Sequence, residues 1–142
     1  MTTGRFKKRK IAIVRADAAT ILLADDDEDL LGGLKISLTR EGYQVVTTGH
    51  GTKVVTLAAR FKPELIILDV IMPGMGGIEV CREIRLRGGR TPVLMLTAKS
   101  EREDREAAAA AGASAYVTKP FKLSDLLGTI RQLIAGSSGL NF

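Results

Sequence analysis

Three short runs of this sequence are apolar at every position, and they constrain the fold more than any other feature. They read ILLA, LIIL and VLML and lie within the expected strands Thr20–Ala24, Leu65–Leu68 and Pro92–Leu96. A strand with one face in water alternates apolar and polar residues, whereas a parallel strand covered by helices on both faces does not alternate. The three runs therefore predict a parallel sheet that is buried between two layers of helices.

Further strands are expected at Gln44–Thr48 and Ala115–Val117, and helical patterns separate and follow the strands. The helices are expected near Asp29–Glu41, Thr52–Arg60, Gly76–Arg87, Glu103–Ala111 and Leu123–Ile134. This alternation predicts an open, doubly wound α/β sheet. Because crossovers between parallel strands are right-handed, helices should cover both faces of the sheet.

The net charge of the chain is concentrated at its N-terminus. Residues 1–17 hold six basic residues and one acidic residue, which equals the whole formal net charge of +5 over 142 residues. We therefore expect a flexible basic extension over residues 1–19, one neutral domain over 20–135 and a short tail over 136–142. The extension is either a solvated terminus or an arm for nucleic acid or an anionic surface.

Single copies of cysteine and histidine exclude several kinds of site. Cys81 alone cannot form an internal disulfide, and His50 alone cannot form a histidine-cluster zinc site. The sequence shows neither an apolar run of membrane-spanning length nor a secretory signal. We therefore expect a cytoplasmic protein without a membrane partner.

Acidic side chains follow the first and third expected strands. Asp25 and Asp26 come directly after the first strand, and Asp69 follows the third. The carboxyl ends of parallel strands meet at one edge of an open sheet, where ligands bind. Clustered carboxylates at this edge suit Mg²⁺. The alternative is that the acidic run only caps the next helix, which accounts well for residues 27–29 but less well for the first two acids.

A hydroxyl and a lysine are expected at the same edge, because Thr97 and Ala98 follow the fourth strand and Lys119 follows the fifth. The lysine can balance the carboxylates and bind a phosphoryl oxygen as a point charge. The alternatives are that Lys119 is an ordinary solvated lysine and that the Thr97 hydroxyl only bonds to nearby backbone.

Four segments, taken in order, resemble the receiver domain of two-component response regulators. They read ILLADDDEDL, LIILDVIMPGMGG, PVLMLTA and AYVTKPF, and the resemblance covers roughly Thr20–Ala135. It implies a flavodoxin-like, five-stranded parallel sheet with strand order 2-1-3-4-5. The family most often has Asp where this chain has Gly76, so the Gly76–Gly77 pair predicts a more flexible loop that lacks a helix-capping side chain.

The resemblance also implies a role for each matching residue. Asp69 corresponds to the aspartate that accepts the phosphoryl group. Asp25, Asp26, Asp69 and the backbone carbonyl of Ile71 correspond to the ligands of Mg²⁺, with Mn²⁺ as an alternative ion. The phosphoryl-binding and switch positions are Thr97, Ala98, Lys119 and Tyr116. Tyr116 is expected to turn from solvent into the space that Thr97 leaves when it moves toward the phosphoryl group.

The implied function is a phosphorylation-activated signalling switch. A sensor histidine kinase or a histidine phosphotransfer protein would supply the phosphoryl group. A downstream protein would then bind the face formed by residues 101–134, and a phosphorylation-dependent dimer is a further arrangement. No DNA-binding domain is expected. Because such a domain modifies only itself, we do not expect an enzyme.

Two other functions remain open at this point. One is a phosphohydrolase of the haloacid dehalogenase type, whose motif D-x-D-x-[TV] is partly matched by Asp25-x-Asp27-x-Asp29. Release of free phosphate over many turnovers would identify it. The other is a receiver that is never phosphorylated and serves only for docking, which would be indicated by failure to bind Mg²⁺.

Overall fold

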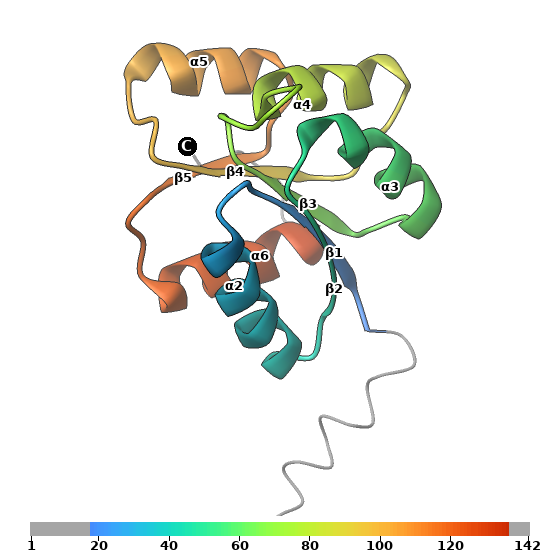
Figure 1. Cartoon of the computed structure of the whole chain (residues 1–142), viewed down its shortest axis with the longest axis vertical. Helices are drawn as coiled ribbons and strands as arrows, with labels where there is room; N and C mark the ends of the chain where they lie inside the picture. Colours follow the sequence, from blue (N-terminus) through green and yellow to red (C-terminus); the bar gives the residue numbers. More distant parts are fainter. Residues whose placement is uncertain (1–17, 137–142) are drawn as a thin grey trace, which may run out of the picture.

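The computed structural model describes residues 18–136, so the basic segment 1–17 and residues 137–142 of the expected tail lie outside the described residues. Within this range the chain forms one five-stranded parallel sheet in the order β2-β1-β3-β4-β5 (Figure 1). The strands are β1 (Thr20–Ala24), β2 (Gln44–Thr48), β3 (Leu65–Leu68), β4 (Val93–Thr97) and β5 (Ala115–Thr118). The predicted parallel sheet and its strand order are therefore confirmed.

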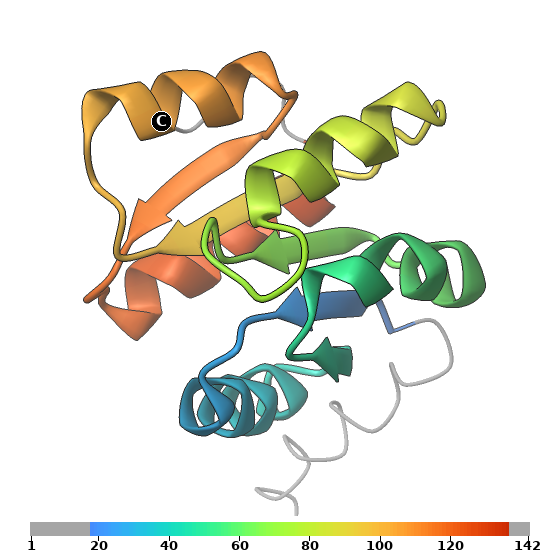
Figure 2. The same ribbon diagram turned by 45° about the horizontal axis from the view of Figure 1, so that its top comes forward.

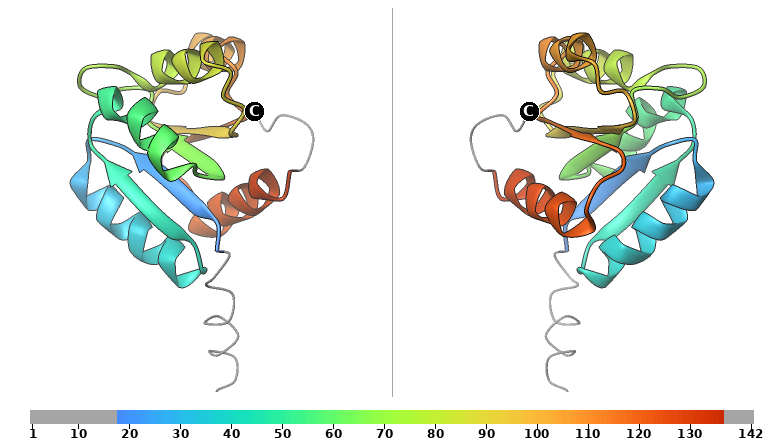
Figure 3. Two further views of the ribbon diagram at one scale, coloured as in Figure 1. Left: turned by 90° about the vertical axis from the view of Figure 1, so that its right-hand side faces the viewer. Right: turned by 90° about the vertical axis from the view of Figure 1, so that its left-hand side faces the viewer.

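Helices cover both faces of the sheet, as expected. They are α2 (Glu28–Arg40), α3 (Val54–Phe61), α4 (Gly77–Leu86), α5 (Arg102–Ala110) and α6 (Leu123–Ile134), with a 3₁₀ turn η2 (Gly51–Lys53). Helices α3, α4 and α5 lie on one face and α2 and α6 on the other (Figures 1 and 3). No helix in the described range is long and apolar enough to cross a membrane.

Most element ends shift by a residue or two from the prediction, and the starts of α3 and β4 do so for clear local reasons. Helix α3 begins at Val54 rather than Thr52, because the Lys53 amide donates to the His50 carbonyl and closes a 3₁₀ turn first. Strand β4 begins at Val93, one residue later than expected, and runs on to Thr97. Proline has no amide hydrogen, and Pro92 joins the sheet only through its carbonyl, which accepts from the Ile66 amide.

Successive residues of the central strands pack into opposite cores. Leu22 and Ile66 belong to the core beneath α3, α4 and α5, which also contains Val80 of α4. Ile21 and Ile67 belong to the second core, beneath α2 and α6. Because side chains alternate between faces along a strand, burial on both faces requires the continuous apolar runs seen in the sequence.

Helix α5 is attached to the rest of the molecule mainly at its C-terminal end. Its one buried residue is Ala108. Just beyond the helix, Arg85 of α4 donates two hydrogen bonds to the Gly112 carbonyl, at 2.9 and 3.2 Å. The Cys81 thiol donates to the Ala111 carbonyl at 3.4 Å. Polar side chains of α4 therefore hold the end of α5, in addition to the burial of its small Ala108 side chain.

Candidate functional site

Asp25 and Asp69 lie side by side where β1 and β3 end. The Asp69 amide donates to the Ala24 carbonyl, and the Asp25 amide donates to the Thr48 carbonyl at the end of β2. Asp25 is 2% exposed and Asp69 8%, whereas Asp26 is exposed. Figure 2 shows that the strands end at one edge of the sheet, with the loops after β1 and β3 next to each other. The structure therefore brings Asp25 and Asp69 together at the carboxyl edge of the sheet, as expected from the sequence.

The rest of the acidic run serves the start of α2. Asp27 is the N-cap residue, and its Oδ1 accepts from the amides of Asp29 and Leu30 at 3.1 and 3.2 Å. Glu28 and Asp29 occupy the first turn, where the helix dipole favours negative charge. Asp25 is not a cap, since its Oδ1 accepts from the Asp27 amide and its Oδ2 faces the site.

Lys119 bridges the two buried carboxylates. Its Nζ lies 2.7 Å from Oδ2 of Asp25 and 2.9 Å from Oδ2 of Asp69. The Lys119 amide donates to the Thr97 carbonyl, and the peptide bond to Pro120 is cis. The alternative of an ordinary solvated lysine is therefore excluded, and the ammonium balances the acidic cluster.

Thr97 and Ile71 supply further hydrogen bonds to Asp69. The Thr97 hydroxyl is fully buried and donates to the Asp69 carboxylate, while its oxygen accepts from the Lys99 amide at 3.2 Å. The Ile71 amide donates to Oδ1 of Asp69 at 3.1 Å, although its side chain is 58% exposed. Ala98 is exposed beside them. Asp69 is thus surrounded by donors from three parts of the chain.

These contacts give the two buried carboxylates opposite pKa shifts. Burial raises the pKa of Asp25, and its hydrogen bonds from Lys119 and the Asp27 amide do not offset the burial. Burial acts on Asp69 in the same direction, but hydrogen bonds from Thr97, Lys119 and the Ile71 amide outweigh it and lower the pKa. Burial would lower the pKa of Lys119, but the two carboxylates outweigh it and raise the pKa. Asp69 is therefore ionised and Lys119 charged at neutral pH.

The carboxylates fit a hard divalent cation. Asp25, Asp26 and Asp69 each offer one carboxylate oxygen, and these oxygens lie within 4.8 Å of one another. All are hard oxygen donors, the type that Mg²⁺ and Mn²⁺ prefer. Asp26 is exposed and has no ion pair among the described residues, so its carboxylate is not occupied by a cation of the protein.

Tyr116 differs from its expected starting position. Its ring is 4% exposed, so the prediction that it faces solvent is wrong. The hydroxyl donates to the Lys99 carbonyl at 2.8 Å, and the Arg105 guanidinium lies 4.9 Å from the ring centre. The ring belongs to the same core as the small side chains of Ala108 and Ala111. Burial raises the pKa of the Tyr116 hydroxyl, with the Asp104 carboxylate acting in the same direction.

The Gly76–Gly77 pair is explained by close packing. A Cβ atom at Gly77 would meet the Asp69 carbonyl, and one at Gly76 would lie 2.6 Å from the Val70 carbonyl oxygen. The missing aspartate cap is partly replaced, because Oε1 of Glu79 accepts from the Gly76 amide at 3.1 Å. The pair lets α4 begin directly against the backbone that carries Asp69.

Comparisons with known proteins agree on one family. A family model described as the response regulator receiver domain matches residues 21–131. The response regulator MprA of Mycobacterium leprae is 41% identical over 114 residues, which cover 80% of this chain and 50% of that protein. The chain therefore spans about half the length of the curated relatives it matches.

Solved structures give the same result for the fold. The BeF3-activated receiver domain of RstA from Klebsiella pneumoniae has a TM-score of 0.78 and 27% identity, covering 81% of this chain and 97% of its own. The chemotaxis protein CheY4 of Vibrio cholerae has a TM-score of 0.77 and 31% identity, covering 82% and 98%.

Proposed function

The chain belongs to the response regulator receiver domain family, and from this membership we propose that Asp69 accepts a phosphoryl group in a Mg²⁺-dependent reaction. The observation that carries the proposal is the setting of Asp69. Its carboxylate lies at the end of a central strand, has a lowered pKa and receives hydrogen bonds from Thr97, Lys119 and Ile71. An ionised carboxylate among preorganised donors is suited to act as a nucleophile.

In the proposed reaction an oxygen of Asp69 bonds to the phosphorus of a phosphohistidine. The P–N bond breaks, the imidazole nitrogen keeps the electron pair, and Asp69 becomes an acyl phosphate. At present the Lys119 ammonium and the Thr97 hydroxyl contact the Asp69 carboxylate. After phosphorylation they would bind oxygens of the phosphoryl group instead. The donor would be a sensor histidine kinase or a histidine phosphotransfer protein.

The metal-binding part of the proposal assigns four ligand groups. Asp25, Asp26, Asp69 and the Ile71 carbonyl would hold Mg²⁺. When bound, Mg²⁺ supplies positive charge that screens the repulsion between the carboxylate and the incoming phosphoryl oxygens. Asp26 would be a stronger determinant of affinity than Asp25, because Oδ2 of Asp25 is already paired with Lys119.

The proposed output passes through Thr97 and Lys99 to α5. The Thr97 oxygen accepts from the Lys99 amide, and the Lys99 carbonyl accepts from the Tyr116 hydroxyl. A Thr97 hydroxyl that turns to a phosphoryl oxygen would disturb this chain of bonds at the start of α5. The face of α5, β5 and α6, within residues 101–134, would then present a different surface to a downstream protein or a second copy.

We propose that this cytoplasmic switch modifies only itself, so it is not an enzyme with a separate substrate. The test uses a small acyl phosphate donor with Mg²⁺ and intact-protein mass spectrometry. The wild-type mass should rise by one phosphoryl group, chelation should suppress the rise, and Asp69→Asn should abolish it. Asp29→Asn is the control, because Asp29 lies in the first turn of α2. A mass shift that survives in Asp69→Asn contradicts the assignment.

The output face has its own test, which is amide exchange with and without beryllofluoride as a stable phosphoryl mimic. Protection should change within residues 97–122, and Thr97→Ala should weaken that change while leaving Asp69 open to phosphorylation. If protection changes only near residues 25–29, the proposed output route is wrong.

A further inference from the structure

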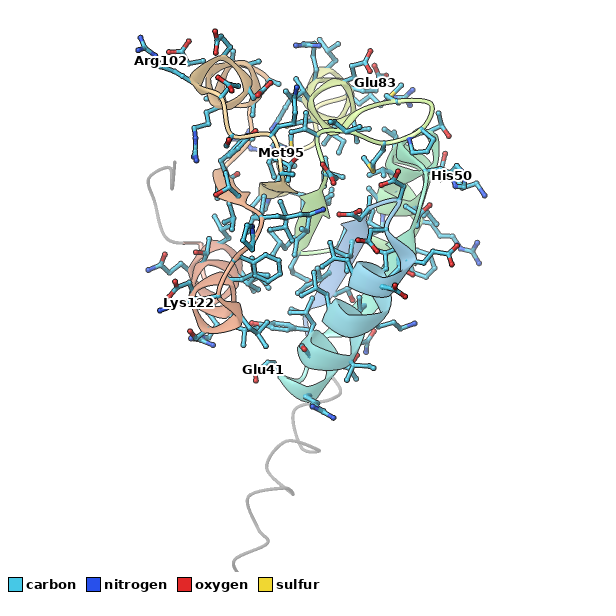
Figure 4. The ribbon with its side chains drawn as sticks, turned by 60° about the vertical axis from the view of Figure 1, so that its left-hand side comes forward. Glu41, His50, Glu83, Met95, Arg102 and Lys122 are labelled. Carbon is cyan, nitrogen blue, oxygen red and sulfur yellow. The ribbon has the colours of Figure 1, made fainter. Side chains whose placement is uncertain are left out.

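We infer that η2, which contributes no side chain to the acidic site, positions the backbone of the 70–76 loop against Asp69. The 70–76 loop is the segment between Asp69, which follows β3, and the start of α4. The inference rests on the proposed function of Asp69 and assigns a role in it to Gly51 and Thr52. Both residues lie on the connection after β2, and Figure 4 labels their neighbour His50 at the margin of the molecule.

The 70–76 loop brings two backbone groups of one residue to the site. The Ile71 amide donates to Oδ1 of Asp69 at 3.1 Å. The Ile71 carbonyl is the proposed fourth metal-ligand group. A backbone group is fixed only by the path of its loop, so whatever holds the loop sets the geometry of both groups.

The two ends of the loop are fastened to each other beside Asp69. The Gly77 amide donates to the Val70 carbonyl at 3.0 Å. The Asp69 carbonyl fills the position that a Cβ atom at Gly77 would occupy, and the Val70 carbonyl does the same at Gly76. The start of α4 therefore cannot move away from Asp69 and Val70, which directly follow β3, without breaking this contact.

The outer part of the loop is held by η2. Gly51 is buried, and the Met75 carbonyl group occupies the place of a Cβ atom there, with the Met75 carbonyl carbon 2.8 Å from that position. The Met72 side chain is 8% exposed, and its Cε lies 3.4 Å from the same point. Gly74 has φ of 82° and packs against Thr52. A Cβ atom at Gly74 would lie 2.7 Å from the Thr52 methyl carbon.

These contacts explain why position 51 needs a glycine. The reason is the close approach of the 70–76 loop, not the backbone conformation of η2. A methyl group at Gly51 must displace the backbone of Met75, which is not the flexible end of a side chain. Because the Gly77 amide is bonded to the Val70 carbonyl at the other end of the loop, the displacement falls on residues 71–75. The amide and carbonyl of Ile71 would then move relative to the carboxylate of Asp69.

The experiment compares Gly51→Ala with Gly49→Ala. A Cβ atom at Gly49 would lie 3.7 Å from the Asp25 carbonyl oxygen, an ordinary contact, so the control adds the same methyl group nearby without displacing the loop. In metal-free protein, Gly51→Ala should shift the amide resonances of residues 70–77. Its dissociation constant for Mg²⁺ should rise by about tenfold, as for other changes that disturb the support of a ligand. Gly49→Ala should stay within about twofold of wild type.

If Gly51→Ala does not fold, a second variant, Thr52→Ala, can still test the inference. It removes the methyl group against Gly74 without adding bulk, and we expect a smaller loss of Mg²⁺ affinity, about threefold. Folded variants with unshifted 70–77 resonances and wild-type affinity overturn the inference. Failure of wild-type protein to be phosphorylated on Asp69 would instead overturn the proposed function, and the metal-free resonances would still test the loop.

Discussion

Lys119 determines the charge balance of the site. Among residues 18–136 it is the cation that contacts both buried carboxylates, and it reaches them from the turn after β5. Its two contacts have unequal consequences, because the pKa of Asp25 stays raised by burial while the pKa of Asp69 is lowered. Without the ammonium, both carboxylates would be left buried beside each other.

We predict that Lys119→Met destabilises the metal-free protein at pH 7. The free energy of unfolding should fall by about 2 kcal/mol, less than for a fully buried pair, because the Lys119 side chain is 22% exposed. The measurement is urea denaturation with and without Mg²⁺, and Mg²⁺ should recover part of the loss. Lys122→Met is the control, since Lys122 is exposed.

The pH dependence of this variant follows from the sign of the Asp69 shift. A lowered folded-state pKa contributes stability that is present above the ordinary carboxyl pKa and is lost as the pH falls through the folded value. The difference in the free energy of unfolding between Lys119→Met and wild type should therefore be largest near neutral pH and should become smaller in acid. Equal stability of the two proteins at pH 7 without metal would contradict the prediction.

At the scale of elements, α5 depends on Arg85. The guanidinium donates to the carbonyls of Gly112 and Gly89, so one side chain of α4 holds both the end of α5 and the connection before β4. Arg85→Met should lower the free energy of unfolding by about 2 kcal/mol, because it leaves partly buried carbonyls without donors. Hydrogen exchange should quicken in residues 107–113.

Two variants accompany Arg85→Met. Arg82→Met removes an exposed guanidinium from the same helix and should change neither stability nor exchange. Arg85→Lys should be intermediate, since an ammonium cannot reproduce the bidentate arrangement. Unchanged exchange at the end of α5 in Arg85→Met would show that other contacts hold this helix.

The elements also show what local sequence can and cannot predict. The apolar runs gave β1 and β3 with their observed ends, and the stripe of α6 gave Leu123–Ile134, because each pattern reflects burial of the residues that carry it. The clustering of Asp25, Asp69 and Lys119 was predictable from the rule that parallel strands end at one edge. Three features could not be predicted, because they depend on contacts between distant segments and leave no local pattern in the sequence. They are the burial of the Tyr116 ring, the hydrogen bonds of Arg85 to the end of α5, and the packing of the 70–76 loop on Gly51.

At the scale of the whole molecule, Cys81 reports on the integrity of one core. The residue is fully buried, and burial raises the pKa of its thiol. The native thiol should react with a disulfide reagent at pH 8 at least about a thousandfold more slowly than an exposed thiol, because it is reached only by unfolding. A Ser100→Cys protein in the Cys81→Ala background supplies the exposed thiol for comparison, since Ser100 is exposed.

The same thiol gives a pH dependence for the fold. A raised folded-state pKa means that the contribution of Cys81 to stability is complete below the ordinary thiol pKa and is lost as the pH rises through the folded value. Urea denaturation of wild type and Cys81→Ala across pH 7 to 11 should therefore show a steeper alkaline loss in wild type. For the labelling experiment, rapid reaction of the native Cys81 thiol with the disulfide reagent would contradict the first prediction and show that the core beneath α4 opens locally.

The pairing of Lys119 with Asp25 spans 94 positions of the chain. A ribosome therefore completes β1, β3 and their carboxylates well before it adds the ammonium that neutralises them. While β5 is still unmade, the nascent sheet edge has its acids but not the internal counter-charge that the finished domain gives them. A sheet formed from the earlier strands alone would therefore leave the charges of Asp25 and Asp69 to solvent and dissolved cations until Lys119 has been added.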